Sequence, residues 1–240
     1  MDAPSNTQQM HKKDPVVVRG MFARIAGRYD LANRVLSGGV DTRWRKLVVR
    51  RAGGDLTGKS AVDVACGTGD LAAVLDRAGA EVLGVDFTFE MLAHAPKKVR
   101  PGMWVQGDAL AMPLQPASAD VVTMAFGLRN VIDRRRCFAE LLRITKPGGK
   151  VLILEFGMPE RDLFGRVYRS YLTHVLPRIG GLLSGDRAAY RYLDSTVQAW
   201  PEAEQLAQEM RDDGFETVEF QRLFRGIAYL HVATAPEGRG

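Results

Sequence analysis

The chain has 240 residues, of which 46% are hydrophobic and 25% are charged, and it carries a formal net charge of +5. This composition is that of an ordinary globular domain with a substantial core, and it excludes a fibrous or low-complexity protein. Two cysteines are too few for a disulfide framework, and no metal-ligand cluster stands out, so we expect no metal. The polar N-terminus and the lack of a long apolar run predict a cytoplasmic protein without a signal peptide or a membrane span.

The N-terminal part of the chain has a helical pattern. Residues 1–15 are polar and are predicted to form a disordered tail. Over residues 16–53, apolar side chains recur at three- and four-residue steps, which predicts a helical cap. A Ser-Gly-Gly break at residues 37–39 divides this cap, and a second helix is expected around residues 44–51.

Strand-like and helical patterns alternate after residue 60, which predicts a parallel, doubly wound α/β sheet with right-handed crossovers. Two alternating runs near the end of the chain predict a closing hairpin that adds an antiparallel last strand, for seven strands in all. The expected strands are residues 60–65, 80–85, 103–107, 119–126, 150–156, 215–220 and 227–234, and the expected helices lie near 70–78, 89–99 and 134–146.

An insert, residues 157–214, precedes the closing hairpin. Apolar residues from Phe164 to Leu183 follow helical spacing, and five arginines lie within or beside this run, at positions 161, 166, 169, 178 and 187. Either this helix simply packs on the domain, which periodicity favours, or it is a lid with an apolar face for a lipid-like substrate and arginines for anionic head groups. We expect one domain over residues 16–235, followed by a short tail at 236–240.

A glycine turn follows the first expected strand, in the segment Asp63-Val64-Ala65-Cys66-Gly67-Thr68-Gly69-Asp70. Its glycines permit a tight turn and a close approach of the backbone to a ligand. Asp86 ends the next strand, where an acid can accept hydrogen bonds from both hydroxyls of a ribose. Together the turn and the acid predict a cofactor that contains a nucleoside.

The turn alone leaves the cofactor open. The glycine spacing of residues 67–72 also fits a dinucleotide fingerprint, and a turn without a ligand has the same pattern. Asp63 and Asp70 place two carboxylates around the turn, which suits a cationic ligand better than a pyrophosphate. Asp108, after the third strand, can accept the amino group of an adenine. With the antiparallel last strand, this pattern resembles the class I S-adenosylmethionine methyltransferases.

Four further segments carry a more specific resemblance. They are residues 18–33, Phe126-Gly127-Leu128-Arg129-Asn130-Val131, Lys146-Pro147-Gly148-Gly149, and residues 190–195 followed by Trp200-Pro201. From about residue 18 to 233, their order and spacing resemble the C-methyltransferases of quinone biosynthesis, which methylate demethylmenaquinone and, in dual-function members, a ubiquinone precursor. Ala125 departs from this family, in which many members carry a serine.

The resemblance implies S-adenosylmethionine as the cosubstrate. The residues implied are Gly67, Thr68 and Gly69 at its amino acid end, Asp63 for the orientation of that turn, Asp86 for the ribose, Asp108 with the backbone of Ala109 for the adenine, and Tyr29 for the sulfonium. A tyrosine ring beside a sulfonium offers a cation–π attraction of about 1 kcal/mol. Tyr29 also fits a plain core aromatic at helical spacing, and this alternative stays open.

Arg129 and Asn130 follow the fourth strand, at the edge that faces the transferred methyl in this fold. C-methylation of a quinol ring requires the neighbouring hydroxyl to lose its proton, and a phenol has a pKa near 10. We expect Arg129 to stabilise the phenolate and Asn130 to orient the hydroxyl. The alternative for Arg129 is an ion pair that holds the loop. His94 and His174 are less favoured as bases.

The predicted reaction is methylation of a prenylated quinol, and the sequence does not separate a naphthoquinol from a benzoquinol acceptor. The basic charge and the arginine-rich insert predict a transient contact with the inner membrane face, and a homodimer is left open. Nucleic acid is not expected as a partner, because the basic runs lack interleaved aromatic residues. The alternatives are a methyltransferase for another small apolar acceptor such as a sterol or polyketide, a non-catalytic cofactor-binding or lipid-carrier module, and a dehydrogenase.

Overall fold

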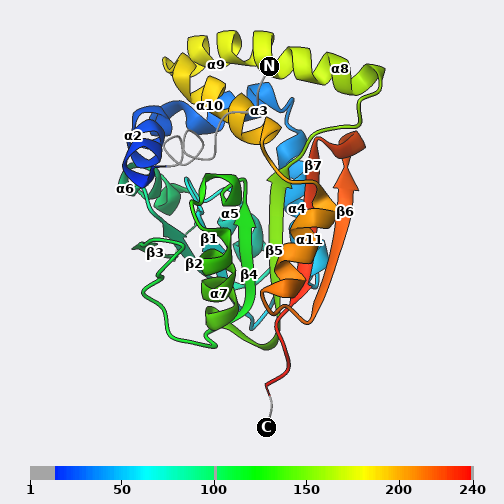
Figure 1. The fold of residues 1–240 in the computed structure, drawn as a ribbon. Coiled ribbons are helices and arrows are strands. Elements are labelled where there is room, and N and C mark those ends of the chain that lie inside the picture. The colour runs from blue at the N-terminus through cyan, green and yellow to red at the C-terminus, as the bar shows by residue number, and fades with distance from the viewer. Residues whose placement is uncertain (1–13, 100–101, 239–240) are drawn as a thin grey trace.

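A seven-stranded sheet lies at the centre of the computed structural model, in the order β3-β2-β1-β4-β5-β7-β6 (Figure 1). The structure describes residues 14–99 and 102–238. The strands are β1 Ser60–Val64, β2 Glu81–Asp86, β3 Met103–Gln106, β4 Ala119–Ala125, β5 Thr145–Phe156, β6 Thr217–Leu223 and β7 Ala228–Thr234. Strand β7 runs antiparallel to β5 and β6, while β1 to β5 pair in parallel. The predicted α/β class with an antiparallel last strand is confirmed.

Helices cover both faces of the sheet. Val48 and Leu75 pack on one face, from α4 Val40–Ala52 and α5 Ala72–Arg77. Phe138 and Leu206 pack on the other, from α7 Arg134–Ile144 and α11 Ala203–Asp212. All four side chains are fully buried, so each face carries its own apolar core.

The helix predicted over residues 89–99 is wrong in extent. Two short helices, α6 Phe89–Leu92 and η2 Ala95–Lys97, replace it. Pro96 lies in η2, and a proline lacks a backbone N–H and disfavours helical conformation at the residue before it. A continuous helix through this segment is therefore interrupted.

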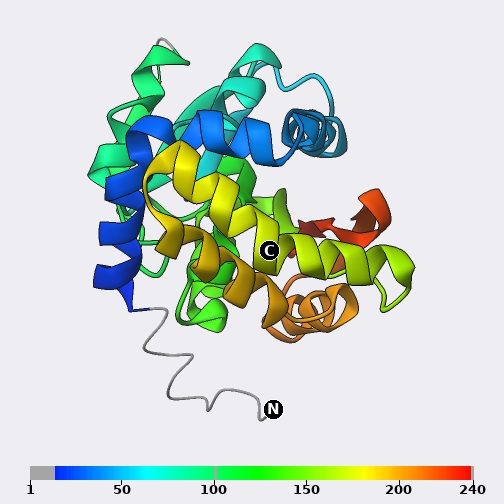
Figure 2. The same cartoon turned by 90° about the horizontal axis from the view of Figure 1, so that it is seen from above.

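A helical cap lies over the carboxyl ends of the parallel strands. Its elements are α2 Pro15–Ile25, η1 Ala26–Arg28, α3 Tyr29–Leu36, α8 Leu163–Ser170, the π-helical segment η4 Tyr171–Val175, α9 Leu176–Ser184 and α10 Arg187–Gln198. The N-terminal helices and the insert share a third apolar cluster that includes Met21, Ile25, Leu176 and Tyr190. Figure 2, which views the molecule from above, shows the two sets of helices side by side. The two halves of the cap therefore form one layer.

The ends of the chain are described only in part. Of the tail predicted for residues 1–15, the first thirteen lie outside the described residues, and Pro15 already begins α2, which the Asp14 side chain caps through the backbone N of Val16. Of the tail predicted for residues 236–240, the last two residues lie outside as well. Among the described residues, no helix combines the length and apolarity that crossing a bilayer requires.

The indole of Trp104 on β3 packs against the glycine turn. A Cβ atom on Gly84 of β2 would lie 2.4 Å from this ring, and one on Gly69 would lie 3.1 Å from it. Because glycine has no side chain at these two positions, the indole lies close against both backbones. The turn after β1 is thus supported by a rigid aromatic ring from two strands away.

Candidate active site

Asp63 anchors the glycine turn from within the protein. Its side chain is buried and accepts hydrogen bonds from the Thr123 hydroxyl of β4 at 2.8 Å and from the backbone N of Ala72 at 3.1 Å. Burial raises the pKa of Asp63 to about 7, against the opposing effects of these hydrogen bonds and of nearby Arg45. The Ala72 contact ties the first turn of α5 to the end of β1.

Asp86 joins the glycine turn to the end of β2. One carboxylate oxygen accepts from the backbone N of Gly67 and the other from the backbone N of Thr88, each at 2.8 Å. Burial raises the pKa of Asp86, and these two hydrogen bonds oppose that shift. Gly67 has φ +57°, and the alanine two residues earlier also has a positive φ, so the chain turns sharply away from β1 here.

A cavity of about 130 Å³ lies at this edge of the sheet, and we call it the strand-edge cavity. The predicted site residues that line it are Tyr29, Gly67, Asp86, Asp108, Ala109 and Asn130. Three further predicted residues, Asp63, Thr68 and Gly69, do not line it. Asp63 and Gly69 instead shape the turn from behind.

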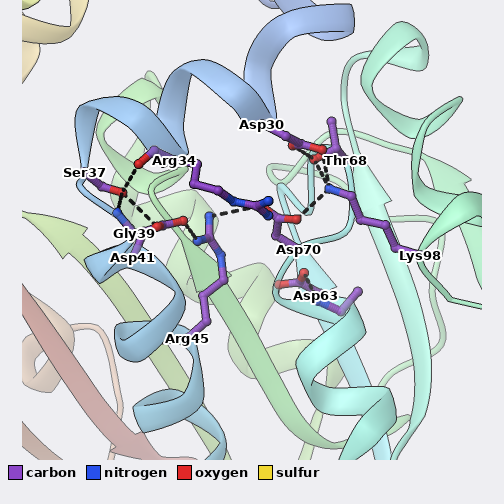
Figure 3. A network of polar contacts seen from close by, with 11 residues as sticks. Asp30, Arg34, Ser37, Gly39, Asp41, Arg45, Asp63, Thr68, Asp70 and Lys98 are labelled. Carbon is purple, nitrogen blue, oxygen red and sulfur yellow. Dashed lines mark hydrogen bonds and ion pairs between the residues drawn. The ribbon is translucent and has the colours of Figure 1, made fainter.

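The Thr68 hydroxyl takes part in a polar network that Figure 3 shows. It donates to Asp30 Oδ1 at 2.5 Å and accepts from Lys98 Nζ at 2.8 Å. The Lys98 ammonium lies 2.6 Å from a carboxylate oxygen of Asp30 in α3 and 2.6 Å from one of Asp70. We call these four residues the Lys98 clasp, because they bind the cap helix α3 to the turn after β1.

The network continues into α4. Arg45 lies 3.7 Å from Asp70 and forms a second ion pair with Asp41 on its own helix. Asp41 in turn accepts a hydrogen bond from the Ser37 hydroxyl, which also accepts from the backbone N of Gly39. The cap is therefore joined to the sheet edge by charged contacts as well as by apolar packing.

Arg129 and Asn130 lie in η3, Leu128–Asn130, after β4. Arg129 Nη1 lies 2.8 Å from Glu155 Oε1, and the Arg129 backbone N donates to Glu155 Oε2 at 3.1 Å. Both side chains are buried, and Nη1 also donates to the Phe126 carbonyl. The pairing with an acid that sequence left open for Arg129 is thus present. Among the described residues, Arg129 Nε and Asn130 Oδ1 are buried atoms without a hydrogen-bond partner.

A second cavity, of about 440 Å³, lies beneath the cap helices, and we call it the cap cavity. Arg129 lines it, and it meets the strand-edge cavity at Phe22, Tyr29 and Phe126, which line both. Asn130 lines only the strand-edge cavity. Element η3 thus contributes one residue to the wall of each cavity.

Aromatic side chains form much of the cap cavity wall. Burial raises the pKa of Tyr29 and of Tyr168, and it raises the pKa of Tyr192 to about 12. These phenols therefore stay protonated at neutral pH and can donate hydrogen bonds. The Phe156 ring lies beneath the Arg129 guanidinium, 5.3 Å from its central carbon.

Sequence reasoning missed two charged residues of the site. Glu155 follows four apolar residues in a buried strand. Because a buried carboxylate needs a partner, this position could have indicated an ion pair from the sequence alone. Lys98 gave no local signal, because its partners lie far away in the chain.

His94 and His174 line neither cavity. The described residues contain no group of three or more potential metal ligands.

The model of the ubiE/COQ5 methyltransferase family matches residues 7–235 of this chain. The chain belongs to this family. It is 46% identical to a demethylmenaquinone methyltransferase of Thermus thermophilus over 90% of this chain and 100% of that protein. It is 43% identical to a ubiquinone/menaquinone biosynthesis C-methyltransferase of Syntrophotalea carbinolica, over 89% of this chain and 92% of that protein. The enzyme is accordingly an S-adenosylmethionine-dependent methyltransferase.

A solved structure supports the fold. Phosphoethanolamine N-methyltransferase 2 of Haemonchus contortus, in complex with S-adenosyl-L-methionine, aligns with a TM-score of 0.62 at 19% identity. The alignment covers 81% of this chain and 53% of that one. At this identity the likeness shows the class I methyltransferase fold alone.

We expect Asp63 to make stability depend on pH. Its native pKa of about 7 exceeds its ordinary value of 3.8, so between these values the native state holds a proton that the unfolded state has lost. The free energy of unfolding should therefore fall as pH rises from about 4 to about 7, by on the order of 4 kcal/mol from this group. Asp63→Asn removes this part, and urea unfolding of both proteins across this range measures it. A difference between the two proteins that does not change with pH would contradict the prediction.

Lys98→Gln should loosen the cap. The change removes the cation that the Asp30 and Asp70 carboxylates share and leaves Asp70 the more distant Arg45, so we expect a loss of roughly 1–2 kcal/mol of stability. Amide hydrogen exchange in residues 15–36 should accelerate, while β4 keeps its protection. Lys97→Gln, at an exposed neighbouring position, is the matched control. Equal exchange in both variants would mean that the clasp does not hold the cap.

Proposed function

We propose that this enzyme transfers the methyl group of S-adenosylmethionine to a ring carbon of a prenylated demethylmenaquinol. The single observation that carries the proposal is the pair of joined cavities. One lies at the strand ends and has Asp86, Asp108 and Asn130 in a largely apolar wall, and the other is aromatic and lies beneath the cap. The names of the relatives identify the same acceptor. No feature of the cap cavity favours a sterol or polyketide acceptor over this one.

The strand-edge cavity fits S-adenosylmethionine. Asp86 lines this cavity, and its carboxylate, held by the backbone N–H groups of Gly67 and Thr88, is an acceptor for the ribose hydroxyls. Asp108 and Ala109 line the part of the cavity that the adenine would occupy, and the unpartnered Oδ1 of Asn130 adds an acceptor. When bound, this cosubstrate supplies an electrophilic methyl on a sulfonium. Tyr29, at the junction of the cavities, offers that cation an aromatic ring.

The cap cavity suits a flat quinol. Phe126 and Phe156, whose ring centroids lie 4.4 Å apart, provide an apolar wall for an aromatic ring. Arg129 lines the same cavity, and among the described residues its Nε and the Tyr192 hydroxyl are buried donors without a partner. Donors fixed beside a developing phenolate favour its ionisation, which makes the ortho carbon nucleophilic.

In this arrangement the cavity promotes loss of the hydroxyl proton by stabilising the anion. None of the described residues that line the cap cavity is a histidine, and the tyrosines there have raised pKa values. The ion pair with Glu155 offsets part of the field that the Arg129 guanidinium exerts. Its role is therefore that of a hydrogen-bond donor to the phenolate more than that of a free cation.

A prenyl tail partitions into the bilayer, so methylation of such an acceptor requires contact with a membrane surface. We infer a peripheral, transient contact with the inner membrane face. One relative bears the ubiquinone/menaquinone name, so a demethylated ubiquinol precursor is a second acceptor to test. Homodimer formation and the absence of nucleic acid partners stay predictions.

We expect methyl transfer from labelled S-adenosylmethionine to reduced demethylmenaquinol in detergent. The assay should be run in parallel with the demethylated ubiquinol precursor, since turnover of both would identify a dual enzyme. Tight binding of the cosubstrate without turnover of either quinol would contradict the proposed acceptor and leave the family assignment intact.

Two substitutions should separate binding from chemistry. Asp86→Asn should weaken cosubstrate binding about tenfold or more, because it removes a charged acceptor of ribose hydroxyls. Arg129→Lys should leave that affinity within about twofold and lower kcat by about 10²-fold, because it removes the Nε donor. Lysine keeps a cation for Glu155, whereas alanine would leave a buried charge unpaired. Isothermal calorimetry and single-turnover kinetics measure the two effects, and equal losses of binding in both variants would refute these roles.

A further inference from the structure

The longest helical stretch of the cap exposes apolar side chains. Elements α8, η4 and α9 follow one another without a gap from Leu163 to Ser184 and lie across the top of the molecule in Figures 1 and 2. Leu163 is 68% exposed and Leu182 is 85% exposed, and Val167, Val175 and Ile179 are exposed as well. The solvent face of a globular helix is normally polar, so this face needs an explanation.

The π-helical segment brings these side chains onto one stripe. Residues of an α-helix advance by about 100° each, so on an unbroken helix the five apolar residues would spread over about 160°. Segment η4 takes up one extra residue, which turns the helix beyond it back by about 100°. The five side chains then fall within about 60° of one another. We call them the apolar stripe.

The charges on the helical stretch that carries the apolar stripe have one sign. Between Leu163 and Ser184 the sequence contains no acidic residue. Arg166 and Arg178 are exposed. With about 100° per residue and the extra residue of η4, both side chains lie on the same side of the stripe. The acids at the two ends, Asp162 and Asp186, are each paired with an arginine from another element. The surface therefore combines apolar side chains with positive charge.

The cap cavity opens beside the apolar stripe. Val167 and Phe224 line the cavity and are also 61% and 60% exposed, so its mouth lies between α8 and η5 Phe224–Gly226. The rings of Phe164 and Phe224 lie 6.2 Å apart at this mouth. Phe224 has φ +40°, a strained backbone conformation for a bulky residue. Such strain is concentrated at functional sites, which supports a functional role for this turn.

We propose that the apolar stripe, with its arginines and Phe224, is the surface by which this enzyme docks on an anionic lipid bilayer. The cavity mouth then faces the lipid, and the tail of the acceptor passes from the bilayer to the ring bound near Arg129. The passage of the tail rests on the proposed function, whereas the docking does not. A second copy of the chain is disfavoured as the occupant, because its own arginines would face these, while anionic head groups complement them.

Sedimentation with vesicles tests the docking. The wild-type enzyme should bind vesicles of equal parts phosphatidylcholine and phosphatidylglycerol at low salt, and bind more weakly to pure phosphatidylcholine. Leu163→Ser with Leu182→Ser should weaken binding about tenfold or more, and Arg166→Ser with Arg178→Ser about fivefold for each arginine. Met103→Ser, which changes an exposed apolar residue of the edge strand β3, is the matched control and should bind like the wild type.

Activity assays separate this proposal from the proposed function. None of the four substituted residues lines either cavity, so methyl transfer to a soluble quinol with one isoprene unit should be unchanged in both double variants. Transfer to a long-tailed quinol embedded in vesicles should fall with vesicle affinity.

Three results would overturn the docking surface. They are absence of wild-type binding at low salt, variants that bind as tightly as the wild type, and a wild-type dimer that the leucine variant splits without any vesicle binding. Loss of binding in the variants, with no methyl transfer to either quinol by any protein, would support the docking and refute the acceptor.

Discussion

The buried ion pair between Arg129 and Glu155 is the contact on which both cavities depend. Glu155 lies near the end of β5 and accepts hydrogen bonds from the side chain and the backbone of Arg129 and from the backbone N of Phe156. It thereby fixes η3, the short segment that carries Asn130 to one cavity and Arg129 to the other. A buried pair of this kind adds little net stability, but either partner alone would be costly, so the geometry is strongly specified.

The two cavities differ in the polar groups of their walls. Two aspartates and an asparagine stand in the largely apolar wall of the strand-edge cavity, whereas aromatic rings form much of the wall of the cap cavity. Burial keeps the tyrosines of the cap cavity protonated, so the acceptor side offers hydrogen-bond donors and a paired guanidinium. Such a surface favours an anionic oxygen over a neutral hydroxyl, which is the change of charge that C-methylation of a quinol requires.

The cap connects this chemistry to the outside of the molecule. Its N-terminal half is held to the glycine turn by the Lys98 clasp, and its second half carries the apolar stripe and the cavity mouth. The two halves share one apolar cluster, so a displacement of one half shifts the packing of the other. Exchange of the cosubstrate and entry of the acceptor are therefore expected to involve the same layer of helices.

The sequence by itself determined the strand order along the chain, the glycine turn, and the acids and the amide at the strand ends, because each of these follows from a pattern within one element. Asp86, Asp108 and Asn130 reach the predicted edge, since parallel strands end on the same side of a sheet. Only the tertiary structure decided the acidic partner of Arg129, which lies 26 residues away in the chain, and the partners of the Thr68 hydroxyl, which lie 30 and 38 residues away. It also decided the π-helical segment, whose extra residue is set by packing of the cap rather than by local propensity. Local periodicity encodes elements, whereas contacts between distant charges exist only after those elements have packed.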